Sequence, residues 1–124
     1  MGKGKVMVVD DDKEFLEELT QTLQLGGYEV VSVPDSTRAG KIANSTKPDV
    51  ILLDLKMHRM SGFEVAEELK KFSDTVMIPI IGMTGVFVEE EHIPLMEICG
   101  IKRCIKKPFN PLDVIAAIET ALNG

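Results

Sequence analysis

Five short apolar runs alternate with amphipathic stretches along the chain, and this alternation constrains the fold more than any other feature. The runs are Lys5–Val9, Tyr28–Val33, Val50–Leu53, Met77–Met83 and Ile101–Ile105. Near-continuous runs of this length are typical of strands buried on both faces of a parallel sheet. Strands joined by crossover helices pair in parallel. The pattern therefore predicts an α/β fold, a doubly wound five-stranded parallel sheet with helices on both faces.

The stretches between the runs carry the signals of helices. Capping residues mark four expected starts: Asp11 with Glu14 (D-x-x-E), Pro34 with Asp35, Ser61 with Glu64 (S-x-x-E), and Asn110 with Pro111. Apolar residues at helical spacing predict the buried faces: Phe15, Leu16, Leu19 and Leu23; Ala39, Ile42 and Ala43; Val65, Ala66, Leu69 and Phe72; Ile115, Ile118 and Leu122. The pair Lys47–Pro48 is expected to end the second helix.

The stretch between the fourth and fifth runs is the least regular, because Pro94 lies in its middle. Proline inside a helix removes a hydrogen bond and clashes with the preceding turn. Either the helix begins late, with Pro94 in its first turn, or it begins near residue 87 and kinks. The late start is favoured, with Glu89–His92 as a loop whose acidic residues face solvent.

Length and charge bound the function. The 124 residues fit one domain, 1–124, and the net charge of −6 argues against direct binding to nucleic acid. No apolar run approaches the roughly 20 residues of a membrane helix. No export signal is apparent, which predicts a cytoplasmic protein. Cys99 and Cys104 lack zinc-ligand spacing and are interpreted as small buried hydrophobic residues.

Polar residues follow four of the five runs. Asp10–Asp12 follow the first, Asp54 the third, Thr84 the fourth, and Lys106–Lys107 the fifth. Ligands of doubly wound sheets bind at the carboxyl ends of the strands. These residues are therefore expected to share one site.

Crowded carboxylates repel one another, and a divalent cation relieves the repulsion. Oxygen ligands without paired His or Cys indicate a hard ion, Mg²⁺. A metal beside a lysine and a threonine hydroxyl suits phosphoryl transfer, in which an aspartate can itself be the nucleophile. Asp12 alone reads as a helix cap or a solvated residue, and Lys106 as a solvent-facing neighbour of Lys107.

Four motifs carry a resemblance to a known family: Val8–Asp12, Leu53–Met57 with Gly62 downstream, Met83–Gly85, and Lys107–Phe109. Each motif is short, but all four occur in order and at the expected spacing. Over essentially its whole length, the chain resembles the receiver domain of bacterial response regulators in two-component systems.

The resemblance implies a role for each matched residue. Asp54 would accept a phosphoryl group from a histidine kinase, a phosphotransfer protein or a small acyl phosphate. Asp10 and Asp11 would hold Mg²⁺ together with Asp54 and the main-chain carbonyl of Lys56. Thr84 would bond a phosphoryl oxygen, and Lys107 would pair with Asp54 or its phosphoryl group.

The resemblance also implies a flavodoxin-like strand order, 2-1-3-4-5, and a cis bond at Lys107–Pro108, which is uncommon among X–Pro bonds. It implies a phosphoacceptor that catalyses its own phosphorylation and dephosphorylation, rather than an enzyme acting on a separate substrate. The expected partners are a kinase and a downstream protein or output domain, and a phosphorylation-dependent homodimer is compatible with the family.

The chain departs from the family pattern at four positions. His58 stands where proline is usual, in the loop after the phosphoacceptor. Ser61 replaces a common Asp and keeps its capping role. Gly85 replaces a common Ala, which would widen access to the acyl phosphate and shorten its life. Cys104 replaces an aromatic residue whose ring turns inward on activation, so we expect signalling through that face to be weakened or rerouted through the loop around Pro94.

One alternative function stays open and a second is disfavoured. Because Cys104 removes the switching aromatic, the chain could be a degenerate receiver that acts as a constitutive interaction module; the intact Asp54, Thr84 and Lys107 favour the phosphorylated form. A phosphatase with an aspartyl nucleophile is disfavoured, since no second acid follows Asp54 at D-x-D spacing.

Overall fold

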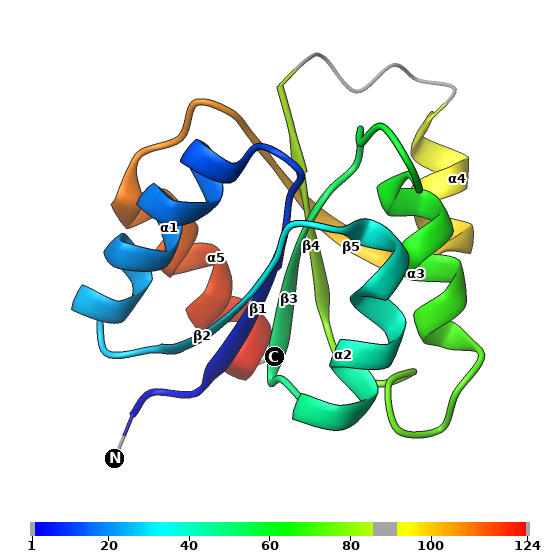
Figure 1. Cartoon of the computed structure of the whole chain (residues 1–124), viewed down its shortest axis with the longest axis horizontal. Helices are drawn as coiled ribbons and strands as arrows, with labels where there is room; N and C mark the ends of the chain where they lie inside the picture. Colours follow the sequence, from blue (N-terminus) through cyan, green and yellow to red (C-terminus); the bar gives the residue numbers. More distant parts are fainter. Residues whose placement is uncertain (1, 86–91, 124) are drawn as a thin grey trace.

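The computed structural model describes residues 2–85 and 92–123, whose strands and helices alternate along the chain (Figure 1). The strands are β1 (Lys5–Val9), β2 (Glu29–Val33), β3 (Val50–Asp54), β4 (Ile80–Thr84) and β5 (Ile101–Lys106). The helices are α1 (Lys13–Leu25), α2 (Ala39–Thr46, after a 3₁₀ turn at Ser36–Arg38), α3 (Gly62–Lys70), α4 (His92–Ile98) and α5 (Pro111–Asn123).

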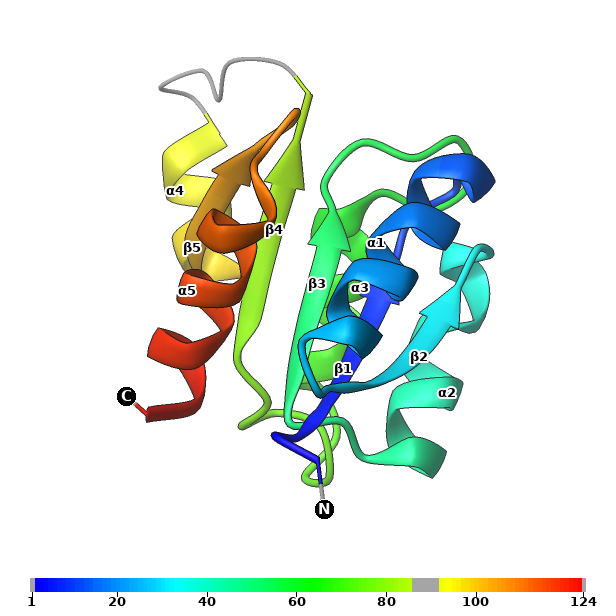
Figure 2. The same ribbon diagram turned by 90° about the vertical axis from the view of Figure 1, so that its left-hand side faces the viewer.

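The strands form one parallel sheet in the order β2-β1-β3-β4-β5, with α1 and α5 on one face and α2, α3 and α4 on the other (Figures 1 and 2). The central strands face both layers. Met7 and Val9 pack toward α2 and α3, whereas Val6 and Val8 pack toward α1 and α5, and all four are fully buried. The predicted fold class and strand order are confirmed.

Most of the helix signals are confirmed. Ser61 and Glu64 form the capping box of α3, Pro111 begins α5, and Lys47 ends α2 in a left-handed conformation before Pro48. The bond between Lys107 and Pro108 is cis.

The predicted cap of the first helix was wrong by one residue. Asp12, not Asp11, caps α1, because its side chain accepts the backbone N–H of Phe15 at 3.2 Å. Asp12 is exposed, so its interpretation as a helix cap is confirmed. The Asp11 carboxylate is left available for other contacts.

The start of the fourth strand was predicted too early. Residues 72–78 form turns, in which Thr75 and Val76 donate N–H bonds to the carbonyl of Phe72 at 3.2 and 2.9 Å. These local bonds compete with the sheet, so β4 begins only at Ile80 and Met77 is exposed. Phe72 was also wrongly assigned to the buried face of the third helix. It lies beyond the end of α3 and is 55% exposed.

Smaller differences concern the ends of elements. The second strand begins at Glu29 rather than Tyr28, and the third and fifth strands each extend by one residue, through Asp54 and Lys106. Pro94 lies in the first turn of α4, which confirms the late start, although His92 is already helical. Residues 89–91 lie outside the described residues. None of the described helices combines the length and apolar character that crossing a membrane requires.

Candidate functional site

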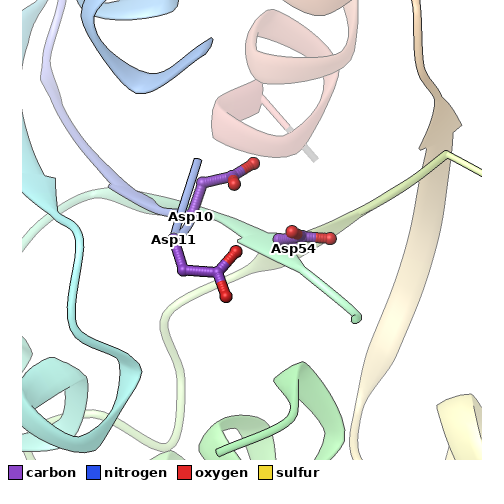
Figure 3. Close-up of side chains that lie close together, drawn as sticks. All are labelled: Asp10, Asp11 and Asp54. Atoms are coloured by element: carbon purple, nitrogen blue, oxygen red, sulfur yellow. The ribbon is translucent and has the colours of Figure 1, made fainter. Parts of the chain in front are cut away.

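Three carboxylates meet at the carboxyl edge of the sheet (Figure 3). Asp10 and Asp11 follow β1, and Asp54 is the last residue of β3, the strand paired directly with β1. One oxygen from each carboxylate lies within 4.8 Å of the others. Asp10 is 0% exposed and Asp54 6% exposed, so two of the three charges are buried. The predicted convergence of strand ends therefore occurs for all three aspartates.

Lys107 reaches this group from the end of β5. Its ammonium Nζ lies 2.6 Å from Oδ2 of Asp10 and 3.7 Å from Oδ2 of Asp54. The predicted pairing with Asp54 is present, but the closer partner is Asp10. The backbone N–H of Lys107 donates to the carbonyl of Thr84 at 2.6 Å. This bond joins the motif at the end of β4 to the motif at the end of β5.

Phe15 makes a contact with Lys107 that the sequence did not reveal. The lysine Nζ lies 4.0 Å from the centroid of the Phe15 ring, and this ring meets Phe109 edge-on at 5.8 Å. A cation over an aromatic face is attracted by the electron density of the ring. The helical spacing of Phe15 marked it only as a core residue, and nothing local in the sequence signals this second contact.

The electrostatics of the site make Asp54 easier to protonate than an ordinary aspartate. Burial of the side chain, together with the negative charge of Asp10, raises the pKa of Asp54 to about 6. Lys107 and the N–H of Lys56 act in the opposite direction, but more weakly. One ammonium therefore does not compensate the crowded carboxylates fully.

The loop between β3 and α3 supplies backbone donors to the site. The N–H of Lys56 donates to Oδ1 of Asp54 at 3.2 Å, and the N–H of His58 donates to Oδ2 of Asp11 at 2.9 Å. The N–H of Gly62 returns to the carbonyl of Leu55 at 3.2 Å. The loop thus folds back against the end of β3.

Gly62 is required by this close return of the chain. A Cβ at Gly62 would lie 2.7 Å from the Cα of Leu55 and still closer to the carbonyl oxygen of Asp54. Backbone atoms cannot yield as a flexible side chain does, so a larger residue would displace the end of β3, which carries Asp54.

The remaining motif residues have distinct environments. Thr84 ends β4 and is 7% exposed, whereas a Cβ at Gly85 would have no heavy atom within 4 Å. Lys106 is exposed, as predicted. Cys99 is buried, whereas Cys104 is only partly buried and packs against the cluster beneath α2 and α3.

The donor set fits a divalent hard cation. Asp10, Asp11 and Asp54 offer carboxylate oxygens from one compact cluster, and oxygen ligands are those that Mg²⁺ prefers. When all three are ionised, their charge exceeds that of Lys107 by two units, which a divalent ion would balance. The raised pKa of Asp54 reflects the same deficit of positive charge.

Comparisons with known proteins agree with this geometry. The family model described as the response regulator receiver domain matches residues 6–119. The chain is 34% identical over 117 residues to the phosphate regulon transcriptional regulatory protein PhoB of Pseudomonas aeruginosa, covering 94% of this chain and 51% of that protein. It is 32% identical to the alkaline phosphatase synthesis transcriptional regulatory protein PhoP of Bacillus subtilis, covering 95% of this chain and 48% of that protein.

Among solved structures, the chemotaxis protein CheY4 of Vibrio cholerae is similar, with a TM-score of 0.90 and 30% identity over 95% of this chain and 98% of that one. The chain therefore spans about half the length of the two transcriptional regulators but nearly all of the chemotaxis protein.

Proposed function

Because this chain belongs to the response regulator receiver domains of two-component systems, we propose that it accepts a phosphoryl group on Asp54 in a Mg²⁺-dependent reaction. The observation that carries the proposal is the position of Asp54. It is buried at the end of β3, beside two further carboxylates, and within ion-pair reach of Lys107. A carboxylate buried beside another acid requires compensating positive charge, which a metal ion would supply together with Lys107.

In the proposed reaction, a carboxylate oxygen of Asp54 attacks the phosphorus atom of the donor. A new P–O bond forms while the bond from phosphorus to the leaving group breaks. The leaving group is the imidazole of a kinase or phosphotransfer histidine, or the carboxylate of a small acyl phosphate. The ionised form of Asp54 is the nucleophile.

Mg²⁺, when bound by Asp10, Asp11, Asp54 and the carbonyl of Lys56, would supply positive charge that stabilises the transferring phosphoryl group. Lys107 moves only a short way to pair with a phosphoryl oxygen, since its ammonium already lies 3.7 Å from Asp54. The hydroxyl of Thr84 donates to another phosphoryl oxygen. Asp10 holds the lysine in place before transfer, through the contact at 2.6 Å.

We propose that residues 1–124 act as one receiver domain. Receiver domains interact with histidine kinases and with output domains, and the two relatives that are transcriptional regulators are about twice as long as this chain. The proposed partners are accordingly a kinase or phosphotransfer protein and an output domain or separate downstream protein. The effect of Cys104 on switching stays a prediction, tested by asking whether Cys104→Tyr strengthens activation.

The proposal is tested by intact mass spectrometry after incubation with acetyl phosphate and MgCl₂. We expect one phosphoryl adduct on the wild-type chain and none on Asp54→Asn. Asp12→Asn is the matched control, because Asp12 is a neighbouring exposed acid that caps α1, and it should retain the adduct. If the wild-type chain neither forms an adduct nor binds beryllofluoride, the result would favour a constitutive interaction module.

A further inference from the structure

The three clustered carboxylates differ in how they are held. Asp10 accepts the backbone N–H of Asp12 at 3.0 Å and the ammonium of Lys107 at 2.6 Å. Asp54 accepts the N–H of Lys56 at 3.2 Å and lies 3.7 Å from the same ammonium. Each of these two therefore has a backbone donor and a cationic neighbour.

Asp11 has a backbone donor but, among the described residues, no cationic neighbour within ion-pair distance. Its carboxylate accepts the backbone N–H of His58 at 2.9 Å. Within residues 2–85 and 92–123, no other hydrogen-bond donor or cation holds this side chain. One backbone N–H, 47 positions along the chain, thus fixes the orientation of Asp11.

The loop that carries His58 is itself anchored, so its N–H is a fixed donor. Met60, two residues on, donates its N–H to Oγ of Ser36 at 3.1 Å. Arg59 lies 3.5 Å from Asp35, an exposed pair that adds a weaker contact. At the end of the loop, the backbone N–H of Gly62 donates a hydrogen bond to the carbonyl of Leu55.

We propose that, in this chain, the backbone N–H of His58 is a positioning group that holds Asp11 in an orientation suited to binding Mg²⁺. Groups that orient a metal ligand commonly change metal affinity by 10–100-fold when they are removed. A carboxylate oxygen has lone pairs enough to accept this bond and to ligate a cation. The inference rests on the Mg²⁺ site of the proposed function and deepens it.

The inference assigns the effect to the backbone and not to the imidazole. The family usually has proline at this position, and proline lacks an N–H. The bond from residue 58 to Asp11 therefore exists in this chain because the residue is not proline. Two substitutions separate the possibilities, since His58→Ala removes the imidazole and keeps the N–H, whereas His58→Pro removes both.

The experiment measures Mg²⁺ affinity of the unphosphorylated chain by ¹H–¹⁵N NMR titration with MgCl₂. The chain has no Trp, so tryptophan fluorescence is not an option. We expect His58→Ala to bind as wild type does and His58→Pro to bind about tenfold more weakly. Thermal unfolding of both variants reports whether the fold is retained.

A second measurement does not depend on the proline variant. In the wild-type chain, the His58 amide should exchange slowly with solvent, and Asp11→Ala should accelerate its exchange while leaving the Lys56 amide unchanged. Equal Mg²⁺ affinity in all three chains, tighter binding by His58→Pro, or an unprotected His58 amide would overturn the inference alone. Absence of Mg²⁺ binding by the wild-type chain would overturn the proposed metal site as well.

Discussion

Replacing Asp54 by Asn is expected to stabilise the metal-free protein at neutral pH. The carboxyl group of Asp54 is buried beside Asp10, and its pKa is raised to about 6, compared with about 3.9 for an ordinary Asp. Ionised Asp54 is therefore a destabilising group in the folded chain. Asn has nearly the same shape as the protonated acid and carries no charge.

The magnitude follows from the difference between the two pKa values. A difference of about 2 units, at about 1.4 kcal/mol per unit, gives about 3 kcal/mol. Below about pH 4 the carboxyl is protonated in both folded and unfolded chains, so its full contribution to stability is present. Between about pH 4 and about pH 6 the unfolded chain loses the proton first, and the contribution is lost as pH rises through the folded pKa of about 6.

Urea unfolding at a series of pH values, without metal, measures this effect. The stability of Asp54→Asn minus that of the wild type should rise from near zero at about pH 4 to about 3 kcal/mol at about pH 7.5. Asp12→Asn is the control, because Asn also caps helices and Asp12 lies exposed outside the three carboxylates. Adding MgCl₂ should reduce the advantage of Asp54→Asn, since the ion stabilises the ionised site. A difference that does not change with pH would refute the reasoning.

Three further tests, with five substitutions between them, address other contacts. Gly62→Ala should lower the free energy of unfolding by about 1–3 kcal/mol, because the added Cβ would overlap the end of β3. Gly85→Ala is the control and should leave the free energy of unfolding unchanged, because a Cβ there meets no heavy atom within 4 Å. Urea unfolding compares the two variants. Asp12→Ala should lower the free energy of unfolding by about 1 kcal/mol, because α1 loses its cap, and should leave Mg²⁺ affinity unchanged. Asp11→Ala should weaken Mg²⁺ binding in an NMR titration and leave the free energy of unfolding unchanged. Lys107→Met should destabilise the chain by about 3 kcal/mol at neutral pH, because it leaves two buried carboxylates without their cation. An NMR pH titration of this variant should find the pKa of Asp54 raised further. An unchanged pKa would contradict the ion pair between Lys107 and Asp54.

The sequence predicted the sheet well because its signal is local and strong. Runs such as Val6–Val9 and Val50–Leu53 are buried on both faces, so almost every residue in them is apolar. The fourth strand was predicted less well, since Met77 and Ile78 look like strand residues although they lie in turns. Turn hydrogen bonds near Thr75 decide between the two structures, and apolar content does not report them.

The candidate site was predictable as a set of residues but not as a set of contacts. The rule that ligands bind at the carboxyl ends of strands collects Asp10, Asp54 and Lys107 without any coordinates. It does not say that the ammonium lies closer to Asp10 than to Asp54, or that Phe15 lies beneath it. These pairings depend on side-chain directions at three separate strand and helix ends, which a one-dimensional pattern does not encode.

If Asp54 is phosphorylated as proposed, the pairing of Lys107 with Asp10 would explain how one lysine can serve the site before and after phosphorylation. Held at 2.6 Å from Asp10, the ammonium offsets part of the carboxylate charge without blocking the Asp54 oxygens, the nearer of which is 3.7 Å away. A phosphoryl group on Asp54 would bring new anionic oxygens toward the same ammonium. The ammonium would then exchange the Asp10 carboxylate for a phosphoryl oxygen over a short distance, without passing into solvent. The cost of reorganising the site would be small for this reason, which would suit the proposed role of Lys107 in stabilising a phosphorylated Asp54 while the unmodified fold stays intact.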